Sequence, residues 1–157
     1  MPGDANHSGG GAVTLAEASA IVDASLAQGA ELELAPLTIA VLDPGGHLVA
    51  LKRSDGSGIL RAEVALAKAW AVLAMGWPSH ELVERAQRMP QFFSSLGVLA
   101  GGRMLPVAGG VPVRRPTGVL AGAVGVSGDT SENDEACAVA GVKAAGLVAW
   151  LDREPAG

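Results

Sequence analysis

At 157 residues, the chain fits one domain that is long enough to bury a sizeable core. Aromatic residues make up only 3% of a chain that is 49% hydrophobic, so Ala, Val, Leu and Gly must build that core. The net charge of -5 argues against a nucleic-acid-binding protein, and the single Cys137 excludes an internal disulfide and a cysteine-based zinc cluster.

The positions of charged residues along the sequence predict where in the cell the protein resides. No Lys or Arg precedes Lys52, so we expect neither a secretory leader nor an arginine-rich transit peptide. The longest apolar run, residues 136–151, contains Lys143 and is too short to span a membrane. We therefore expect a cytoplasmic protein without membrane contact. Its charged fraction of 17% leaves a charge-poor surface, which favours a homo-oligomer.

Residues 1–13 are rich in Gly, Ser and Asn and are interpreted as a disordered lead-in. A single domain is expected over residues 14–152, followed by a flexible tail at 153–157. Thr14 and Glu17 have the spacing of a capping box, which predicts a helix that begins there and stops near Gly29.

Two short strands, residues 37–42 and 47–52, are expected next, joined by an Asp-Pro-Gly-Gly turn. After a polar loop, an alanine-rich helix is predicted over residues 59–75 and is ended by Pro78. A short helix should follow from Ser79, and residues 90–96 should add another turn. Residues 104–126 then return to strand patterns, broken at two glycine-containing turns into three strands.

The segment 118–136 predicts a buried strand, a glycine-rich turn and the start of a helix that runs to about Leu151. Ser131 and Asp134 have capping-box spacing. Four acidic residues crowd the positive end of this helix, so a phosphate would be repelled, and no P-loop or dinucleotide motif is present. Strands joined by hairpins and covered by helices indicate an α+β layered domain with an antiparallel sheet.

Five short motifs occur in one order along the chain, followed by Asp134 in the last predicted helix. They are residues 37–43 with 45–48, residues 53–56, residues 67–69, residues 109–113 and residues 122–128. Together they resemble the GlcG/HbpS family, which includes the C-terminal domain of PduO-type proteins. The resemblance covers roughly residues 14–150. It implies a profilin-like fold, a five-stranded antiparallel sheet flanked by helices, usually in dimers or larger rings.

The same resemblance implies several functions, since some family members look like haem-binding or corrinoid-linked proteins and others belong to small-molecule catabolism. Haem would need an axial ligand. The chain has no Tyr and no C-x-x-C-H motif, which excludes tyrosine ligation and covalent attachment. The remaining candidates are His47, His80, Met75, Met89, Met104 and Cys137. None is convincing, because the histidines are scattered and Cys137 lies in an apolar helix that suggests a core position.

Lys68 is the most suggestive single residue because it is the only charge between Glu63 and Glu81. A buried ammonium must pair with a carboxylate or give up its proton more readily, and such a lysine can bind an anion or act as a base or nucleophile. Alternatively, its stem packs on apolar surface and its head reaches solvent.

Arg53 and Asp55 follow the second strand of the hairpin. Arg53 could clamp a carboxylate, with Asp55 orienting either Arg53 or Lys68. Alternatively, the two residues form a weak ion pair that stabilises the turn. His47 could act as an acid or base, since histidine ordinarily titrates near neutrality, or it could be a solvated turn residue.

Two glycine-rich segments, Gly109-Gly110 and Ser127-Gly128, are first explained as turns that allow close approach of the backbone. They could also line a shallow pocket with open N–H groups for a carboxylate or carbonyl oxygen. No metal site is expected.

Taken together, these residues favour a cytoplasmic, oligomeric protein that binds a small ligand, either haem or another anion. Its pocket would be lined by Arg53, Asp55, Lys68 and the glycine turns. The alternative is a cofactor-free enzyme of isomerase, hydratase/lyase or cyclase type that acts on a small carboxylate or carbonyl compound in a catabolic or biosynthetic pathway. Lys68, His47 and Asp55 would then be its catalytic residues. An accessory subunit without chemistry is the third hypothesis.

Overall fold

The computed structural model describes residues 11–152; residues 1–10 of the predicted lead-in and the predicted tail 153–157 lie outside the described residues. The end of the lead-in is packed against the domain. Val13 is buried in the core, and its backbone N–H donates to Ala121 O at 2.8 Å. The Arg115 guanidinium donates to the carbonyl oxygens of Gly11 and Ala12.

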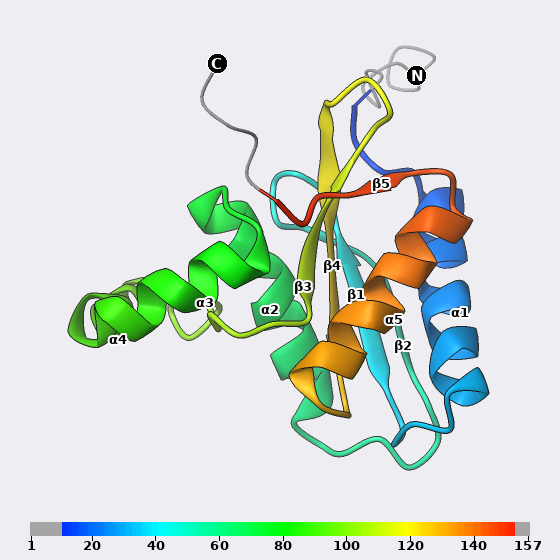
Figure 1. Cartoon of the computed structure of the whole chain (residues 1–157), viewed down its shortest axis with the longest axis horizontal. Coiled ribbons are helices and arrows are strands. Elements are labelled where there is room, and N and C mark those ends of the chain that lie inside the picture. Colours follow the sequence, from blue (N-terminus) through cyan, green and yellow to red (C-terminus); the bar gives the residue numbers. More distant parts are fainter. Residues whose placement is uncertain (1–10, 153–157) are drawn as a thin grey trace, which may run out of the picture.

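One five-stranded sheet, with every neighbouring pair antiparallel, forms the centre of the fold (Figure 1). Its spatial order is β2-β1-β4-β3-β5. The strands are β1 (Thr38–Leu42), β2 (Leu48–Arg53), β3 (Gly110–Arg114), β4 (Leu120–Ser127) and β5 (Val148–Ala149).

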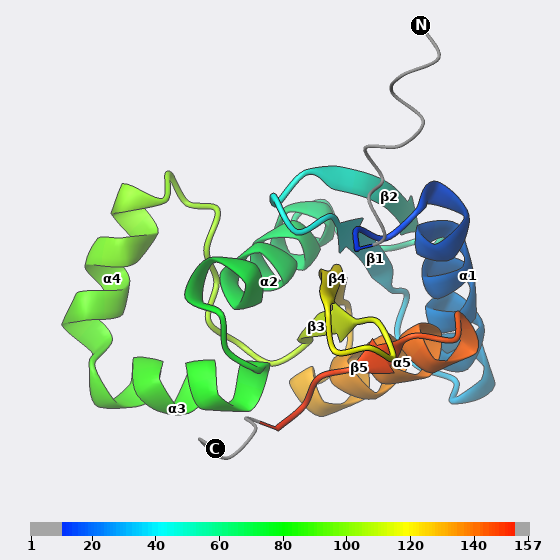
Figure 2. The same ribbon diagram turned by 90° about the horizontal axis from the view of Figure 1, so that it is seen from above.

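Helices cover both faces of this sheet. They are α1 (Leu15–Glu31), α2 (Arg61–Met75), α3 (Ser79–Arg88), α4 (Pro90–Leu99) and α5 (Ser131–Ala144). Seen from above, α1 and α5 pack on one face and α2 packs on the other (Figure 2). The prediction of an α+β layered domain with a five-stranded antiparallel sheet is confirmed.

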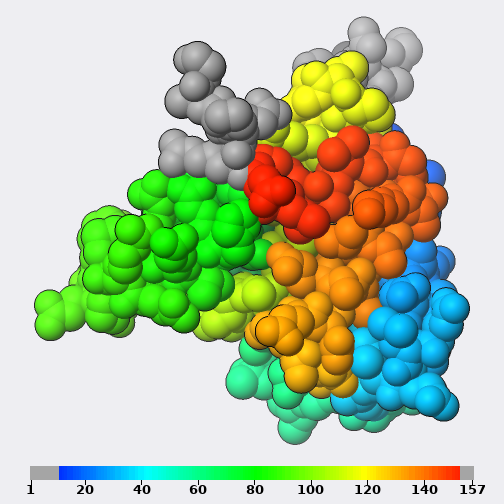
Figure 3. All heavy atoms as spheres, viewed as in Figure 1, coloured from blue at the N-terminus to red at the C-terminus, as the bar shows by residue number. Residues whose placement is uncertain are grey.

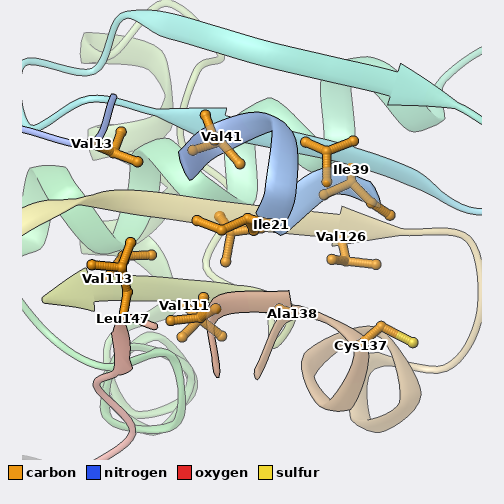
Figure 4. Close-up of a cluster of buried hydrophobic side chains, with 14 of the residues drawn as sticks. Val13, Ile21, Ile39, Val41, Val111, Val113, Val126, Cys137, Ala138 and Leu147 are labelled. Carbon is orange, nitrogen blue, oxygen red and sulfur yellow. The ribbon is translucent and has the colours of Figure 1, made fainter. Parts of the chain in front are cut away.

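The main core lies between the sheet and the α1–α5 layer. Figure 4 shows branched side chains of the strands, such as Ile39, Val41 and Val126, facing Ile21 of α1 and Cys137 of α5. Cys137 is fully buried, as its apolar surroundings predicted. A smaller cluster between the sheet and α2 also includes residues of α3 and α4.

The start of α1 is predicted correctly. Thr14 is the N-cap, its hydroxyl accepts from the Glu17 N–H, and the Glu17 carboxylate accepts from the Thr14 N–H. The helix continues through Gly29 and ends at Glu31, because Gly29 packs inside the layer rather than ending the helix: a Cβ there would lie 2.6 Å from Leu37.

The last helix differs from the prediction at both ends. Its cap is Thr130, whose hydroxyl accepts from the Asn133 N–H, whereas the Asp134 carboxylate accepts from the Asp129 N–H instead of closing a box with Ser131. The helix ends at Ala144, not near Leu151. Gly146 has a left-handed φ of 75°, which turns the chain so that β5 can pair with β3.

Two strands rather than three occupy residues 104–126, and the fifth strand is β5. Residues 104–109 form a loop instead, because this segment packs against α2: Met104 is buried and the Leu105 N–H donates to Ala67 O.

The predicted short helices, α3 and α4, form an arm that projects beyond the rest of the domain (Figure 3). The arm is joined to the body through α2 and through Ser79, whose hydroxyl donates to Glu135 of α5 at 2.7 Å. Within residues 11–152, every helix is too short or too polar to cross a membrane.

Candidate functional site

A hollow with a volume of about 280 Å³ is partly open to solvent. It lies between the β1–β2 hairpin, one side of α2 and the loop that follows α4; we call it the Trp70 groove. Its lining is mostly apolar, with one acidic and one basic side chain. The lining residues are Leu42, Gly46, Leu48, Glu63, Leu66, Ala67, Trp70, Gly101, Gly102 and Arg103.

Helical spacing explains why α2 presents these side chains together. Glu63, Leu66, Ala67 and Trp70 stand at positions i, i+3, i+4 and i+7, which place them on one side of the helix. Their neighbours on α2 that face the sheet, including Lys68, are buried instead. The groove is therefore built by the side of α2 that the sheet leaves uncovered.

Gly46 brings the hairpin turn onto the Trp70 indole. Its φ is 82°, and a Cβ at this position would lie 3.0 Å from Trp70 Nε1. The same turn and the same indole bound a second hollow of about 110 Å³, with Pro44 and Leu73 in its wall. Only glycine fits here without moving the indole, so Gly46 fixes the position of Trp70 between the two hollows.

Arg103 lies on the other side of the groove and over the Trp70 ring. Its Cζ is 4.7 Å from the ring centre, within cation–π range. Two consecutive left-handed glycines, Gly101 and Gly102, turn the chain so that Arg103 reaches this place. Arg103 Nε donates to Ala100 O at 2.7 Å. Within the described part of the chain its Nη groups form no hydrogen bond, so they are available to a ligand.

Lys68 is buried and is held by two oxygens. Its Nζ donates to Val126 O at 3.0 Å and to Asp134 Oδ2 at 3.1 Å, and its side chain is 5% exposed. The carboxylate that Lys68 meets is thus Asp134 of α5, from the opposite layer. This pair, which we call the Lys68 junction, ties α2 to β4 and α5.

The glycines beside this junction permit close approach between α2 and the sheet. A Cβ on Gly110 would lie 2.2 Å from Lys68 O, and one on Gly109 would lie 2.9 Å from Lys68 Nζ. Gly125, which is paired with Gly110 across β3 and β4, would place a Cβ 1.9 Å from Ala65 O. The structure brings Lys68, Gly109 and Gly110 together, as packing partners.

The other predicted ligand-binding residues lie at the end of the sheet and in the following loop. Arg53 donates to the carbonyl oxygens of Ser57 and Gly58. Ser127 Oγ accepts from Arg61 at 3.2 Å. A Cβ on Gly128 would lie 2.3 Å from Pro36 O, so this glycine also serves close packing.

Asp55 lies apart from Lys68, in the wall of a separate hollow of about 180 Å³ under the end of α1. His47 lies in the hairpin turn with 80% of its side chain exposed. Its Nδ1 is 3.1 Å from Asp43 Oδ1, which also accepts from the N–H groups of Gly45 and His47. His47 therefore belongs to an Asx-type turn at the surface.

The candidate iron ligands do not enter the Trp70 groove, since its lining contains no His, Met or Cys. Met104, next to Arg103, is buried in the smaller core. Burial raises the pKa of the Cys137 thiol, as do the nearby Asp134 and Asp129 carboxylates, so this side chain is an inert part of the main core. Within residues 11–152, no group of three or more His, Cys, Asp or Glu side chains could hold a metal ion.

Trp70, Glu63 and Arg103 were not among the site residues that the sequence predicted. A usable signal was present: an indole seven residues after a glutamate places both on one side of a helix. Arg103 carried no comparable signal, since its approach depends on the path of the loop after α4.

Comparison with known proteins identifies the family. The family model for haem degrading HbpS-like proteins matches residues 13–143. The chain belongs to the HbpS-like family. This HbpS-like chain is 30% identical over 122 residues to an uncharacterised 15.0 kDa protein of the dhaT-dhaS intergenic region of Citrobacter freundii, a match that covers 78% of this chain and 84% of the relative.

Solved structures agree with this assignment. A complex of PduOC with haem has a TM-score of 0.76 at 24% identity, covers 87% of this chain and 96% of its own, and shows the shared fold. A variant of HbpS from Streptomyces reticuli has a TM-score of 0.72 at 26% identity, with 84% of this chain and 86% of its own covered. The resemblance to the GlcG/HbpS family is confirmed.

Proposed function

We propose that this protein binds a planar, largely apolar molecule that carries a carboxylate, and that it does so in the Trp70 groove. The observation that carries the proposal is the combination of Trp70, Arg103 and an apolar wall in one hollow. An indole and leucine side chains favour a flat apolar body, whereas free guanidinium N–H groups favour an anion. Such a site is the usual form of a small-molecule pocket.

Tetrapyrroles such as haem are the candidate ligand class. The support comes from the family, whose model describes haem degrading proteins, and from the PduOC structure, which is a complex with haem. The groove volume of about 280 Å³ is just below the range for ligand pockets, roughly 300–1,000 Å³. A tetrapyrrole would therefore place one edge inside and extend beyond the mouth along the half-exposed Leu48.

The groove can hold one edge of the haem ring and a carboxylate, but it offers no ligand for the iron. Its lining offers no imidazole, thioether or thiolate, which are the usual axial ligands, and the chain contains no Tyr. We therefore propose binding and derive no reaction from it.

Titration with hemin tests this proposal. We expect saturable quenching of tryptophan fluorescence and a shifted Soret band in the wild-type protein. Trp70→Leu should weaken binding about tenfold or more, by analogy with other stacked aromatic contacts. Trp77→Leu is the matched control, because Trp77 also lies under an arginine, Arg85 at 4.0 Å, but outside the groove. Absence of saturation, or equal weakening in both variants, would contradict the proposal.

The enzyme hypothesis receives less support from the geometry. Lys68 Nζ is enclosed between Val126 O and Asp134, so a substrate would have to displace both contacts to reach it. Asp55 and His47 lie in other parts of the surface. A cofactor-free reaction at these three residues remains a prediction that no contact in the structure favours.

Homo-oligomerisation also belongs to the proposal. Large apolar side chains are exposed on the monomer, including Ile59 at 94% and both Val98 and Leu99 at 82%. Exposed apolar surface of this kind is typical of an interface. Sedimentation velocity should show a species larger than 15.7 kDa, and a monomer at micromolar concentration would refute it. The cytoplasmic location stays a prediction.

A further inference from the structure

We infer that the Trp70 groove recognises a tetrapyrrole by its carboxylated edge, with Arg103 as the anchor and Glu63 as the residue that rejects carboxylates elsewhere on the ring, whether or not the ring holds a metal. This inference rests on the proposed function and adds a ligand specificity to it. Its basis is the placement of one positive and one negative side chain in an otherwise apolar hollow.

Arg103 is oriented for a carboxylate. The hydrogen bond from Nε to Ala100 O holds one side of the guanidinium, and its Cζ lies 4.7 Å from the centre of the Trp70 ring. The Nη edge is left without a partner in the described part of the chain. A guanidinium held in this way can bind both oxygens of one carboxylate, which gives directionality as well as affinity.

Glu63 has the opposite effect on a ligand. It lies one turn of α2 from Leu66 and two turns from Trp70, on the same side of the helix, and no salt bridge of the described residues engages it. A ligand carboxylate beside Glu63 would meet a like charge. One placed against Leu42 or Leu66 would lose water without gaining a hydrogen bond. The groove therefore accepts carboxylates at the Arg103 end alone.

The residues that line the Trp70 groove predict that a metal at the centre of the ring does not change the binding affinity. Because no His, Met or Cys reaches the groove, the protein gains no bond from an iron at the ring centre. Protoporphyrin IX and hemin, which have the same ring and the same two carboxylates on one edge, should thus bind alike. Uroporphyrin, whose carboxylates surround the ring, should bind poorly.

Four probes test this inference by fluorescence quenching: hemin, metal-free protoporphyrin IX, protoporphyrin IX dimethyl ester and uroporphyrin. On the wild-type protein we expect the first two to bind within about threefold of each other. The ester should bind about tenfold more weakly or worse, since a charge-assisted bidentate contact is lost. These comparisons need no variant, so a folding defect cannot obscure them.

Substitutions of Arg103 and Glu63 then test the role proposed for each residue. Arg103→Gln should weaken protoporphyrin IX about tenfold and bring the acid and the ester to nearly equal affinity. Arg85→Gln, which removes the other arginine that covers a tryptophan, should leave both affinities unchanged. Glu63→Gln should strengthen uroporphyrin binding several-fold, without weakening protoporphyrin IX.

Two results would overturn the inference while leaving the proposed function intact. Hemin could bind where protoporphyrin IX does not, which would show recognition of the metal. The acid and the ester could bind equally well to the wild type, which would show that no carboxylate is read. If none of the four probes binds, the proposed function fails and this inference fails with it.

Discussion

Helix α2 carries Lys68 on the side that faces the sheet and Glu63 on the other side, and the two charges have different surroundings. On the side that faces the sheet, Lys68 is closed in by Val126 O and Asp134, and its charge is used inside the protein. On the other side, Glu63 and the nearby Arg103 border a hollow and keep unpaired polar groups. The comparison teaches that an isolated charge in an apolar helix can be satisfied inside the protein, whereas the proposed ligand site lies where charges remain unsatisfied.

The largest loss of stability is expected when the Lys68 junction is broken. Lys68→Met leaves the Asp134 carboxylate buried at 1% side-chain exposure with its cation removed, which should lower the free energy of unfolding by about 3–5 kcal/mol. Urea unfolding followed by circular dichroism measures this. The double variant Lys68→Met/Asp134→Leu is the control and should recover most of the loss, because it removes both charges. Unchanged stability in the single variant would show that the junction is not structural.

A second prediction concerns the contact that brings α2 onto the sheet. Gly125→Ala would place a Cβ 1.9 Å from Ala65 O, a backbone atom that cannot move alone, so α2 must shift. We expect a loss of about 2–3 kcal/mol in unfolding free energy. Gly97→Ala is the matched control, since its Cβ would meet nothing within 4 Å in helix α4. It should stabilise the protein by about 0.5–1 kcal/mol. Equal effects of the two changes would contradict the close approach.

The smallest loss of stability is expected when the ion pair between Glu17 and Arg115, which lies nearer the surface, is removed. Hydrogen bonding from Arg115 lowers the pKa of Glu17 to about 2 in the folded protein, from 4.5. Because the folded pKa is the lower one, the stabilisation is complete above pH 4.5 and disappears as the pH falls towards 2. Glu17→Gln should cost only about 1 kcal/mol at pH 7, because the pair is partly solvated.

Urea unfolding of wild type and Glu17→Gln between pH 7 and pH 2 tests this. The difference between the two proteins should shrink as the pH falls from 4.5 to 2. A difference that is constant over this window would refute the ion-pair explanation. A loss as large as that of Lys68→Met would remove the distinction between a buried pair and a partly exposed one.

The sequence predicted the parts of the fold that local patterns determine. Thr14 and Glu17 marked a helix start correctly, and the Asp-Pro-Gly-Gly turn marked the β1–β2 hairpin. The end of the last helix was wrong, because the apolar run after Ala144 pairs with β3 as a strand instead. Such an exchange of helix for strand is decided by tertiary contacts, which a local pattern does not contain.

The candidate site could be predicted much less well. The sequence marked Lys68 as an isolated charge but left open whether it is buried or reaches solvent, and its partner, Asp134, is 66 residues away and lies on another layer. The Trp70 groove requires a hairpin, a helix and a loop to meet. Its residues Trp70 and Arg103 are 33 positions apart and form no motif, so only the folded chain shows that they face one hollow.

The most direct test of the account is a parallel hemin titration of wild type, Trp70→Leu and the double variant Lys68→Met/Asp134→Leu, each first shown to be folded by circular dichroism. The account predicts that Trp70→Leu weakens binding about tenfold or more, while the double variant stays within about threefold of wild type. If the folded double variant loses binding and Trp70→Leu retains it, the ligand site is at the Lys68 junction and the account is wrong.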